Sequence, residues 1–406
     1  MSGLMARLAD WAVKNRSGMP RWRGRVRGSA AGKPDGVVGR VSAKLRGGGG
    51  AAPNTEVPEA AVRVYVAPTN YAAQGYEWAR ALERADPDVA ARNMAVDLPG
   101  GYRFPADTVV PIAAVNGSSA WGRAEWEAAR QFSHVLVEAE RSMFGREFNR
   151  DLEQEIAALT AAGVSVAFIC HGTDIRDPEH HAALTRWSPY PEDPRTETLQ
   201  HDARANLALL RRAQRPTFIS TPDLAADVPE AVWCPVVVNT QRFATAVPAF
   251  SRDRVRVIHA SSNPLQKGSD RIEPALAQLI GAGSLDYELI TSTPADQMPG
   301  VFAAADIVLD QFRLGSYGVA ACEAMAAGRV VVGHVMPEVR ERVERDFALE
   351  LPIVEATPNT LGEVIAGLLA DPDRARAIAA AGPAYVSRVH SGSASAQALL
   401  DHWIRA

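Results

Sequence analysis

The residues with the clearest chemical potential lie in the stretch 305–333, where one carboxylate sits among small and apolar side chains. We predict a buried strand at 306–309, a polar loop at 310–317 and a helix at 318–327. A strand, a glycine-containing loop and a helix start present free N–H groups to an anion. Glu323 lies beyond the first turn of that helix, where two neighbouring ribose hydroxyls would suit its carboxylate; the alternative is a solvated surface glutamate.

A second stretch with related chemistry begins at residue 255. We predict a strand at 255–259, a loop at 260–267 and then a helix with Ser269 as its N-cap. Lys267 stands directly before this helix start, where its charge and the free N–H groups together suit a diphosphate; the alternative is an ordinary exposed lysine. The same loop holds side chains that can donate hydrogen bonds without charge: Ser261, Ser262 and Asn263.

Three polar residues follow a predicted strand in the first half of the chain. The apolar run 164–170 leads directly into His171, Asp174 and Arg176. In open α/β sheets, ligands bind at the carboxyl ends of the strands, so this position favours a functional role. The alternative is a structural turn in which Asp174 caps the next element and Arg176 pairs with Asp177.

The stretch around Glu323 resembles the nucleotide-sugar loop of GT-B glycosyltransferases of the retaining, glycogen-synthase-like and mannosyltransferase-like type (family 4-like, group 1). Those enzymes carry Glu-x7-Glu with Phe-Gly between the acids, then Ala-Met-Ala-x-Gly and a valine strand. This chain matches at Tyr317-Gly318, at 323–326 and at Gly328. It departs at the first acid, where Gly315 stands. In the family the first acid touches the donor sugar and the second holds the ribose.

The resemblance implies a set of site residues. His171 would meet the donor sugar near the reacting carbon, and Lys267 and Glu323 would complete the catalytic group. The donor-binding residues would be Ser261, Ser262, Asn263, Lys267, Gly268, Thr291, Gly315, Ser316, Tyr317, Gly318, Val319 and Glu323. The acceptor side would be formed by Asn70, Gln74, Gly75, Asp174 and Arg176. The resemblance implies no metal or cofactor, and no histidine or cysteine spacing fits a zinc site.

The alternation of predicted strands and helices indicates the fold class, an α/β protein, and the resemblance implies two doubly wound Rossmann-like domains facing a cleft. We expect a basic N-terminal extension at 1–60, disordered or lying on a membrane surface, and an acceptor-side domain at 61–240. A nucleotide-sugar domain is expected at 241–385, and a C-terminal helix at 386–406 that crosses back to the first domain. A chain of 406 residues is long enough for two such cores.

Composition limits the class of protein further. The chain is 47% apolar and 22% charged, which is typical of globular proteins. Its cysteines, Cys170, Cys234 and Cys322, are far apart, so we expect a reducing compartment and a cytoplasmic protein. No apolar run is long enough for a membrane span, and the start lacks a secretory signal.

The charge is distributed unevenly. The net charge is −4, yet residues 1–50 hold 11 Lys and Arg against 2 Asp and Glu. Leu4, Leu8 and Trp11 would share one face of a helix. The segment 1–46 therefore suggests attachment to an anionic membrane surface at the inner face. Non-specific attachment to nucleic acid and a disordered leader without function are the alternatives; we expect no specific nucleic acid.

The function implied by the resemblance is transfer of a sugar from a nucleotide-sugar donor to a sugar, lipid-linked or polysaccharide acceptor. The basic tail hints at a lipid-linked or envelope-linked acceptor, in bacterial envelope, polysaccharide or glycolipid synthesis, and the resemblance implies retention of configuration. Gly315 in place of the first acid raises one alternative, a non-catalytic nucleotide-sugar-binding or regulatory protein. Another alternative is a nucleotide-sugar epimerase on the same fold.

Overall fold

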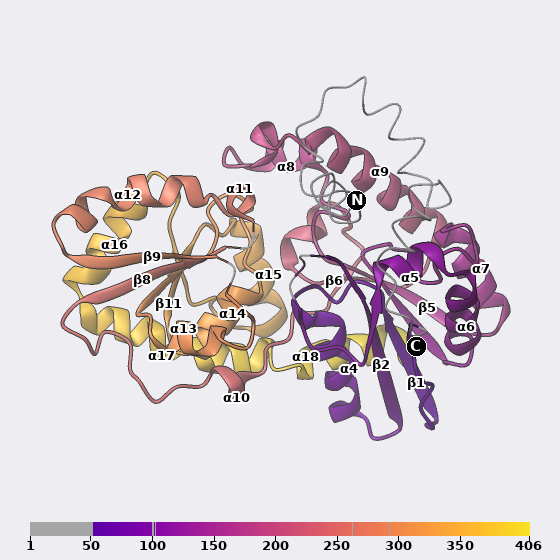
Figure 1. Ribbon diagram of the computed structural model, residues 1–406. Helices are drawn as coiled ribbons and strands as arrows, with labels where there is room; N and C mark the ends of the chain where they lie inside the picture. The colour runs from indigo at the N-terminus through magenta and orange to yellow at the C-terminus, as the bar shows by residue number, and fades with distance from the viewer. Residues whose placement is uncertain (1–51, 100, 102, 262, 292) are drawn as a thin grey trace, which may run out of the picture.

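The computed structural model describes residues 52–406 except 100, 102, 262 and 292. The amphipathic and basic segment expected at 1–46 lies outside these residues, as does the predicted donor-binding residue Ser262. Two α/β domains stand side by side, the first in indigo to magenta and the second mainly in orange and yellow (Figure 1). The expected fold class, α/β with two Rossmann-like domains, is confirmed.

The first domain is built on a parallel sheet with strand order β3-β2-β1-β4-β5-β6-β7. Its strands are β1 (Val62–Ala67), β2 (Val89–Asp97), β3 (Thr108–Pro111), β4 (His134–Glu138), β5 (Ser165–Cys170), β6 (Thr217–Ile219) and β7 (Val232–Trp233). β1 pairs with both β2 and β4. The strand order therefore reverses direction between β1 and β4, and the carboxyl ends at such a point are where open α/β sheets bind ligands.

Helices cover both faces of this sheet. Val64 and Val66 of β1 pack with α4 and the C-terminal helices, whereas Tyr65 and Ala67 face the side of α6, α7 and α9. Burial on both faces explains the continuous apolar strands of the sequence. The helices are η2 (Tyr71–Ala73), α4 (Gln74–Ala85), α5 (Ile112–Gly117), α6 (Ser119–Ala129), α7 (Leu152–Ala161), α8 (Pro178–Leu184), η3 (Tyr190–Glu192), α9 (Thr196–Ala213) and η4 (Pro222–Ala226). The short helix α10 (Thr240–Phe243) follows them and packs against the second domain.

The second domain repeats the plan with strand order β12-β11-β10-β8-β9. Its strands are β8 (Val255–Ala260), β9 (Leu285–Ile290), β10 (Ile307–Leu309), β11 (Val330–Gly333) and β12 (Ile353–Glu355). Its helices are α11 (Pro264–Lys267), α12 (Ser269–Gly281), α13 (Met298–Ala303), α14 (Val319–Ala326), α15 (Pro337–Phe347), α16 (Leu361–Ala370) and α17 (Pro372–Val389). The strand order reverses between β8 and β10, so their carboxyl ends form the corresponding binding point of this domain.

The carboxyl edges of the two sheets face each other. Arg313, in the loop after β10, donates to both carboxylate oxygens of Glu192 at 2.7 and 3.0 Å. The imidazole Nε2 of His181, on α8, donates to the carbonyl of Leu314 at 3.1 Å. Both segments follow the carboxyl ends of parallel strands, β10 in one domain and β5 in the other. These contacts therefore bring the two predicted ligand-binding edges together.

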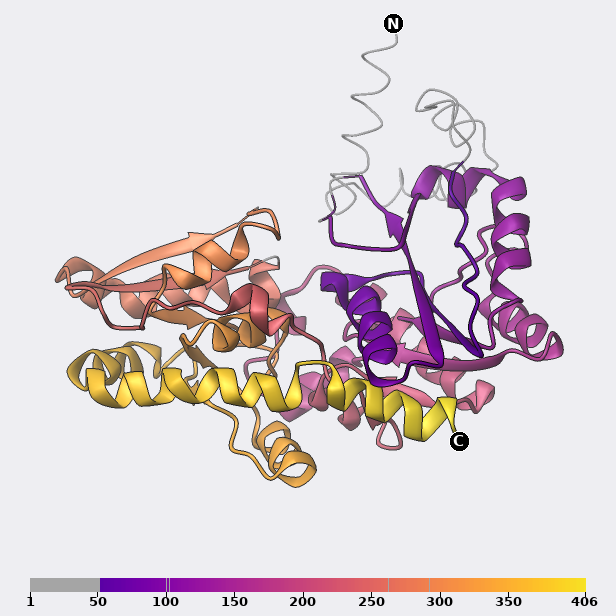
Figure 2. The ribbon, with the colours of Figure 1, turned by 90° about the horizontal axis from the view of Figure 1, so that it is seen from below.

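The end of the chain lies on the first domain. After α17, the helix α18 (Ser393–Leu399) and a π-helical turn (Leu400–Ile404) run along α4, as the yellow ribbon of Figure 2 shows. Trp403 is 3% exposed, and its indole N–H donates to the Ser165 hydroxyl at 2.9 Å. The last helices therefore form part of the first domain's core.

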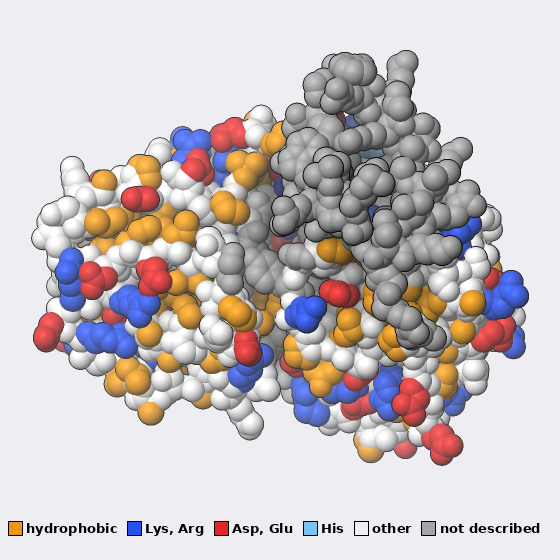
Figure 3. Space-filling model, viewed as in Figure 1, with side chains coloured by type: hydrophobic (Ala, Val, Ile, Leu, Met, Phe, Trp, Pro, Cys, Tyr) orange, Lys and Arg blue, Asp and Glu red, His pale blue; other side chains and the backbone are white. Residues whose placement is uncertain are grey.

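Over the described residues, no helix combines the length and the apolar character that crossing a membrane requires. In the view of Figure 3, lysines and arginines alternate with aspartates and glutamates over both domains. That face of the described residues therefore carries both signs of charge interspersed.

We predict that Trp403→Ala destabilises the first domain by about 3–5 kcal/mol, because it removes a buried indole and leaves a cavity beside His134 and Ser165. Urea unfolding followed by circular dichroism measures the loss as a lower midpoint. His402→Ala is the matched control, since His402 is exposed on the same turn. Equal midpoints for the two variants would show that the C-terminal segment contributes no packing energy.

Candidate active site

Two turns of the second domain are bonded to each other directly. β8 ends at Ala260 and leads to Lys267, and β10 ends at Leu309 and leads to the next loop. The N–H of Phe312 donates to the carbonyl of Lys267 at 3.0 Å. The Lys267 ammonium donates to the Asp310 carboxylate at 3.1 Å. Because β8 and β10 are neighbours in the sheet, these bonds hold both turns as one unit.

The protein orients the Lys267 ammonium. Its Nζ donates to the carbonyl of Ala260 at 3.0 Å and to Oδ1 of Asp310 at 3.1 Å, and its side chain is 18% exposed. An ammonium carries three N–H donors, so one remains for a ligand. The geometry suits a fixed cation facing a diphosphate better than a freely moving surface lysine.

A buried histidine supports this turn. His259 Nδ1 donates to the carbonyl of Leu309 at 2.8 Å, which leaves Nε2 to accept from the Ser269 hydroxyl at 2.7 Å. Burial lowers the pKa of His259 to about 4, so the ring is neutral at physiological pH. The hydroxyls of Ser269 and Ser261 are 3.2 Å apart. The prediction that Ser269 is the N-cap is wrong, because Gly268 occupies that position with φ 75°. The Ser269 hydroxyl instead bonds to His259.

Glu323 lies on α14 with its carboxyl partly buried. Burial raises its pKa to about 7, and the nearby positive charges of Arg242 and Lys267 oppose that rise. Among the described residues, none donates a hydrogen bond to this carboxylate. Lys267 is therefore close enough to Glu323 for its charge to influence that carboxyl group, and the shared nucleotide site stays a prediction. Arg242, which also donates to the carbonyl of Ala295 at 2.6 Å, was missed because the sequence places it in a linker.

Two glycines of the donor loop have opposite surroundings. Gly318 stands at the N-cap of α14, and a Cβ added there would meet no atom within 4 Å, so a ligand can approach the N–H groups of Gly318 and Val319. Gly315 has φ 69°, and a Cβ there would lie 2.5 Å from Cγ of Met336. No acid fits at position 315 without displacing Met336, which explains the departure from the Glu-x7-Glu pattern.

The side chains of the two residues between these glycines, Ser316 and Tyr317, make contacts with other parts of the protein. Ser316 is buried beside the Asp223 carboxylate of the first domain. The Tyr317 hydroxyl lies 2.8 Å from that of Tyr385 and 3.2 Å from Nε2 of His390. Their side chains therefore anchor the loop, and their predicted role in donor binding stays a prediction.

The other predicted donor residues lie around the same edge. The Asn263 side chain accepts from the N–H of Gln266 at 3.4 Å and caps α11. Thr291 is exposed in the loop after β9. Their proposed contacts with a donor remain predictions.

On the first domain, the sequence analysis missed a buried carboxylate. Glu138 ends β4, and its oxygens accept from the N–H groups of Thr69 and Asn70 at 3.0 Å. Nε2 of His171 lies 3.3 Å from Oε1 of Glu138. A Cβ on Gly75 would come within 2.9 Å of the same carboxylate. Glu138 thus connects the turn after β1 to the surroundings of His171. The sequence feature that could have identified it is an acid at the end of an apolar strand.

The predicted residues Asn70 and Gln74 make structural bonds. Asn70 donates to the carbonyl of Pro105 at 2.8 Å and accepts from the N–H of Tyr76 at 3.0 Å. Gln74 bonds both backbone groups of Val237, at 2.6 and 3.0 Å. Both side chains therefore shape the turn after β1 and its join to the second domain.

Asp174 and Arg176 are also engaged. The Asp174 carboxylate accepts from the N–H groups of His171, at 2.8 Å, and Gly172. Arg176 pairs with Asp223 at 2.5 Å rather than with the adjacent acid suggested by the sequence. Burial alone would raise the pKa of Asp223, but the charge of Arg176 and hydrogen bonds from Ser316, Arg176 and Thr221 together lower it. The acceptor-side role of both residues stays a prediction.

One cluster beneath this turn has the composition of a metal site. Ligand atoms of Glu140, Cys170 and Asp174 lie within 4.8 Å of one another. Burial, reinforced by nearby acids, raises the pKa of Glu140 and that of Cys170 well above their ordinary values. Both shifts favour the protonated forms, whereas a metal binds the deprotonated ones.

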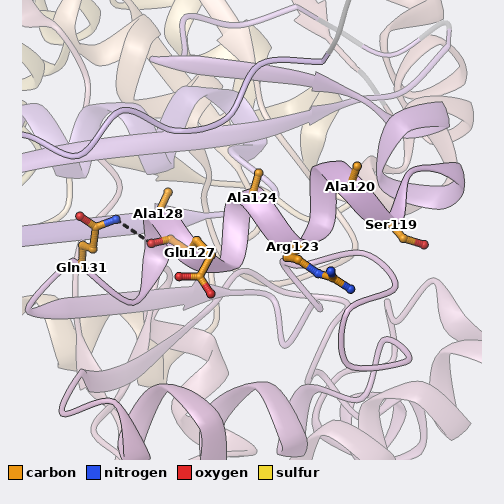
Figure 4. A pocket seen from close by; sticks show the side chains of 7 residues that line it. All are labelled: Ser119, Ala120, Arg123, Ala124, Glu127, Ala128 and Gln131. Atoms are coloured by element: carbon orange, nitrogen blue, oxygen red, sulfur yellow. Dashed lines mark hydrogen bonds between the residues drawn. The ribbon is translucent and has the colours of Figure 1, made fainter.

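A surface hollow on the outer face of α6 lies apart from these residues (Figure 4). It is lined by Ser119, Ala120, Arg123, Ala124, Glu127, Ala128 and Gln131. None of the predicted site residues lines it. The strand ends, rather than this hollow, hold the groups capable of donor chemistry.

Comparison with known proteins supports the architecture. Residues 271–401 match a family model described as glycosyl transferase-like. No curated protein matches the chain by sequence. The fold is similar to sucrose-phosphate synthase from Thermosynechococcus elongatus, with TM-score 0.57 and 12% identity, covering 83% of this chain and 97% of that one.

Two further solved structures are similar. HepE from Anabaena, in complex with UDP and glucose, has TM-score 0.51 and 12% identity over 83% of this chain and 98% of that one. An alpha-glucosyltransferase, in complex with UDP-glucose and DNA containing an abasic site, has TM-score 0.52 and 8% identity over 82% and 96%. The chain therefore has the GT-B architecture of two Rossmann-like domains, with a glycosyl transferase-like match in its second half.

We predict that Gly315→Ala destabilises the protein by about 1–3 kcal/mol, because it combines a left-handed backbone with overpacking against Met336. Thermal unfolding should show a clearly lower midpoint. Gly318→Ala is the matched control and should cost less, within about 1 kcal/mol, because its φ is −126° and its Cβ meets open space. A tolerated Gly315→Ala would contradict the steric explanation for the missing acid.

Proposed function

We propose that the protein is a glycosyltransferase that moves a sugar from a nucleotide-sugar donor, held by the second domain, to an acceptor held by the first. The observation that carries the proposal is the bonded pair of turns after β8 and β10. The pair orients the Lys267 ammonium, whose charge also opposes the rise in the pKa of Glu323, and this supports a single site for both groups. The glycosyl transferase-like match over 271–401 supports it, since both residues belong to or adjoin that domain.

The proposed mechanism uses charge stabilisation at the leaving group. The bond from the sugar's anomeric carbon to the phosphate oxygen breaks, and its electrons remain on the diphosphate. Lys267 and the N–H groups of Gly318 and Val319 stabilise that growing charge. Glu323 accepts hydrogen bonds from the ribose hydroxyls. These groups supply the stabilisation without a metal or cofactor, and we propose that none is used.

On the facing domain, we propose that His171 meets the donor sugar near the reacting carbon. Oε1 of the buried Glu138 lies 3.3 Å from Nε2 of this ring. Asn70, Gln74 and Gly75 shape the acceptor side through the turn after β1. Asp174 and Arg176 would act through the loop that carries His171.

For the acceptor and setting, we propose a sugar, lipid-linked or polysaccharide acceptor in bacterial envelope synthesis, transfer with retention, and a cytoplasmic location. Buried unpaired cysteines support a reducing compartment. Retention rests on the resemblance of the donor loop, and the anomeric configuration of the product, read by NMR, tests it. UDP is the first nucleotide to examine, because two proteins of similar fold are described with UDP or UDP-glucose bound.

A second candidate is a protein that binds a nucleotide sugar without transferring it. The observation that favours it is Gly315, where the structure has no room for the acid of the related enzymes. Incubation with UDP- and GDP-sugars distinguishes the two functions. We predict slow donor hydrolysis, which releases nucleoside diphosphate measurable by a coupled assay. Binding without any turnover would support the non-catalytic function.

We predict that Glu323→Ala weakens binding of UDP roughly 10- to 100-fold, because it removes a charged acceptor of two ribose hydroxyls. Isothermal titration calorimetry at about pH 8 measures the change. An unaltered dissociation constant would contradict the ribose role. Glu341→Ala, on the exposed face of α15, is the control and should leave the affinity unchanged.

The raised pKa of Glu323 predicts a pH dependence. The carboxyl is mostly protonated below its pKa of about 7 and accepts hydroxyls best when ionised above it. UDP affinity should therefore fall roughly tenfold between about pH 8 and about pH 5.5. The phosphate of UDP titrates in the same range, so Glu323→Gln is the control. An equal pH profile for wild type and Glu323→Gln would exclude Glu323 as the titrating group.

A further inference from the structure

The carboxylate of Asp310 differs from the other acid on its strand. Asp310 directly follows β10, at the carboxyl end of that inner strand, and is 3% exposed. Its Oδ1 accepts from Lys267, whereas Oδ2 is buried and accepts from none of the described residues. Asp306, at the amino end of the same strand, uses both oxygens to accept from the N–H groups of Phe250 and Arg256, at 2.7 and 2.8 Å.

A buried carboxylate oxygen without a donor is unfavourable, because folding removes the water that solvated it. The pair Lys267–Asp310 therefore places an unused acceptor beside a cation that has one unused N–H. Adjacent donor and acceptor groups of this kind match the hydroxyls of a sugar, each of which both donates and accepts. The pair lies at the strand ends where α/β sheets bind ligands.

The position of Lys267 relates this pair to the donor. Under the proposed function, on which this inference rests, the Lys267 ammonium contacts the diphosphate. The sugar is joined directly to that diphosphate, so its first hydroxyls come within reach of a carboxylate bonded to the same ammonium. Position 315, five residues further along the loop, offers no carboxylate because Met336 fills the space of a side chain.

We propose that Asp310 supplies the carboxylate that recognises hydroxyls of the donor's sugar ring, in place of the acid absent at position 315. Oδ2 accepts from a ring hydroxyl near the anomeric carbon, and Oδ1 keeps Lys267 directed at the diphosphate. Asp310 thereby makes the donor site selective for a sugar attached to the nucleotide.

The test is Asp310→Asn. The amide oxygen still accepts from Lys267, and the amide nitrogen replaces Oδ2 at the same size. Calorimetry would compare UDP with UDP-glucose and GDP with GDP-mannose. We expect nucleoside diphosphate affinity to stay within about threefold, and nucleotide-sugar affinity to fall roughly tenfold or more. Asp306→Asn is the matched control: it removes a buried carboxylate of the same strand and should leave the affinity ratio unchanged.

The outcomes separate this inference from the proposed function. Three outcomes would overturn the sugar-recognition role and leave the transferase proposal standing. Asp310→Asn could weaken nucleoside diphosphate and nucleotide-sugar binding equally, or weaken neither. Asp306→Asn could also change the ratio of the two affinities as much as Asp310→Asn does. If the wild-type protein binds neither the nucleoside diphosphates nor the nucleotide sugars, the transferase proposal fails and this inference fails with it.

Discussion

Lys267 and Asp310 bond the ends of two neighbouring strands of the second domain, β8 and β10. This bond joins the turn after β8 to the loop after β10. The ammonium bridges them, the N–H of Phe312 reinforces the join, and the neutral His259 holds the turn to Leu309 from below. These bonds hold three groups at one edge of the sheet: the Lys267 ammonium, the N-terminus of α14 and the unpaired Oδ2 of Asp310.

The first domain faces this edge with a site organised around Glu138, a buried acid held by backbone N–H groups from the turn after β1. Arg313 and Glu192 join the two domains through an ion pair whose arginine is almost fully buried. The Arg313 guanidinium also donates to the carbonyls of Trp187 and Ser188, at 3.2 and 3.3 Å. The loop that carries Gly315 and Gly318 is therefore fixed by both domains, and donor binding and domain contact involve the same segment.

Local pattern was sufficient to predict much of the second domain. The strands at 255–259 and 306–309, the helix near 318–327 and the positions of Lys267 and Glu323 follow from apolar runs, glycines and a lone acid. The failures involve partners distant in sequence. Arg176 pairs with Asp223 across 47 positions, and Tyr317 turns toward Tyr385, 68 residues later. Ser269 was expected to cap a helix, but the buried His259 takes its hydroxyl. The sequence analysis did not identify Asp310 or Glu138 as site residues, because their burial and their bonding partners are set only by the folded structure.

A crystal structure of the protein with UDP shows whether the two bonded turns form one nucleotide site. We expect the diphosphate within hydrogen-bond distance of Nζ of Lys267 and of the N–H groups of Gly318 and Val319, with the ribose hydroxyls on Glu323. UDP bound elsewhere, with Lys267 and Glu323 both free of it, would rule out such a site.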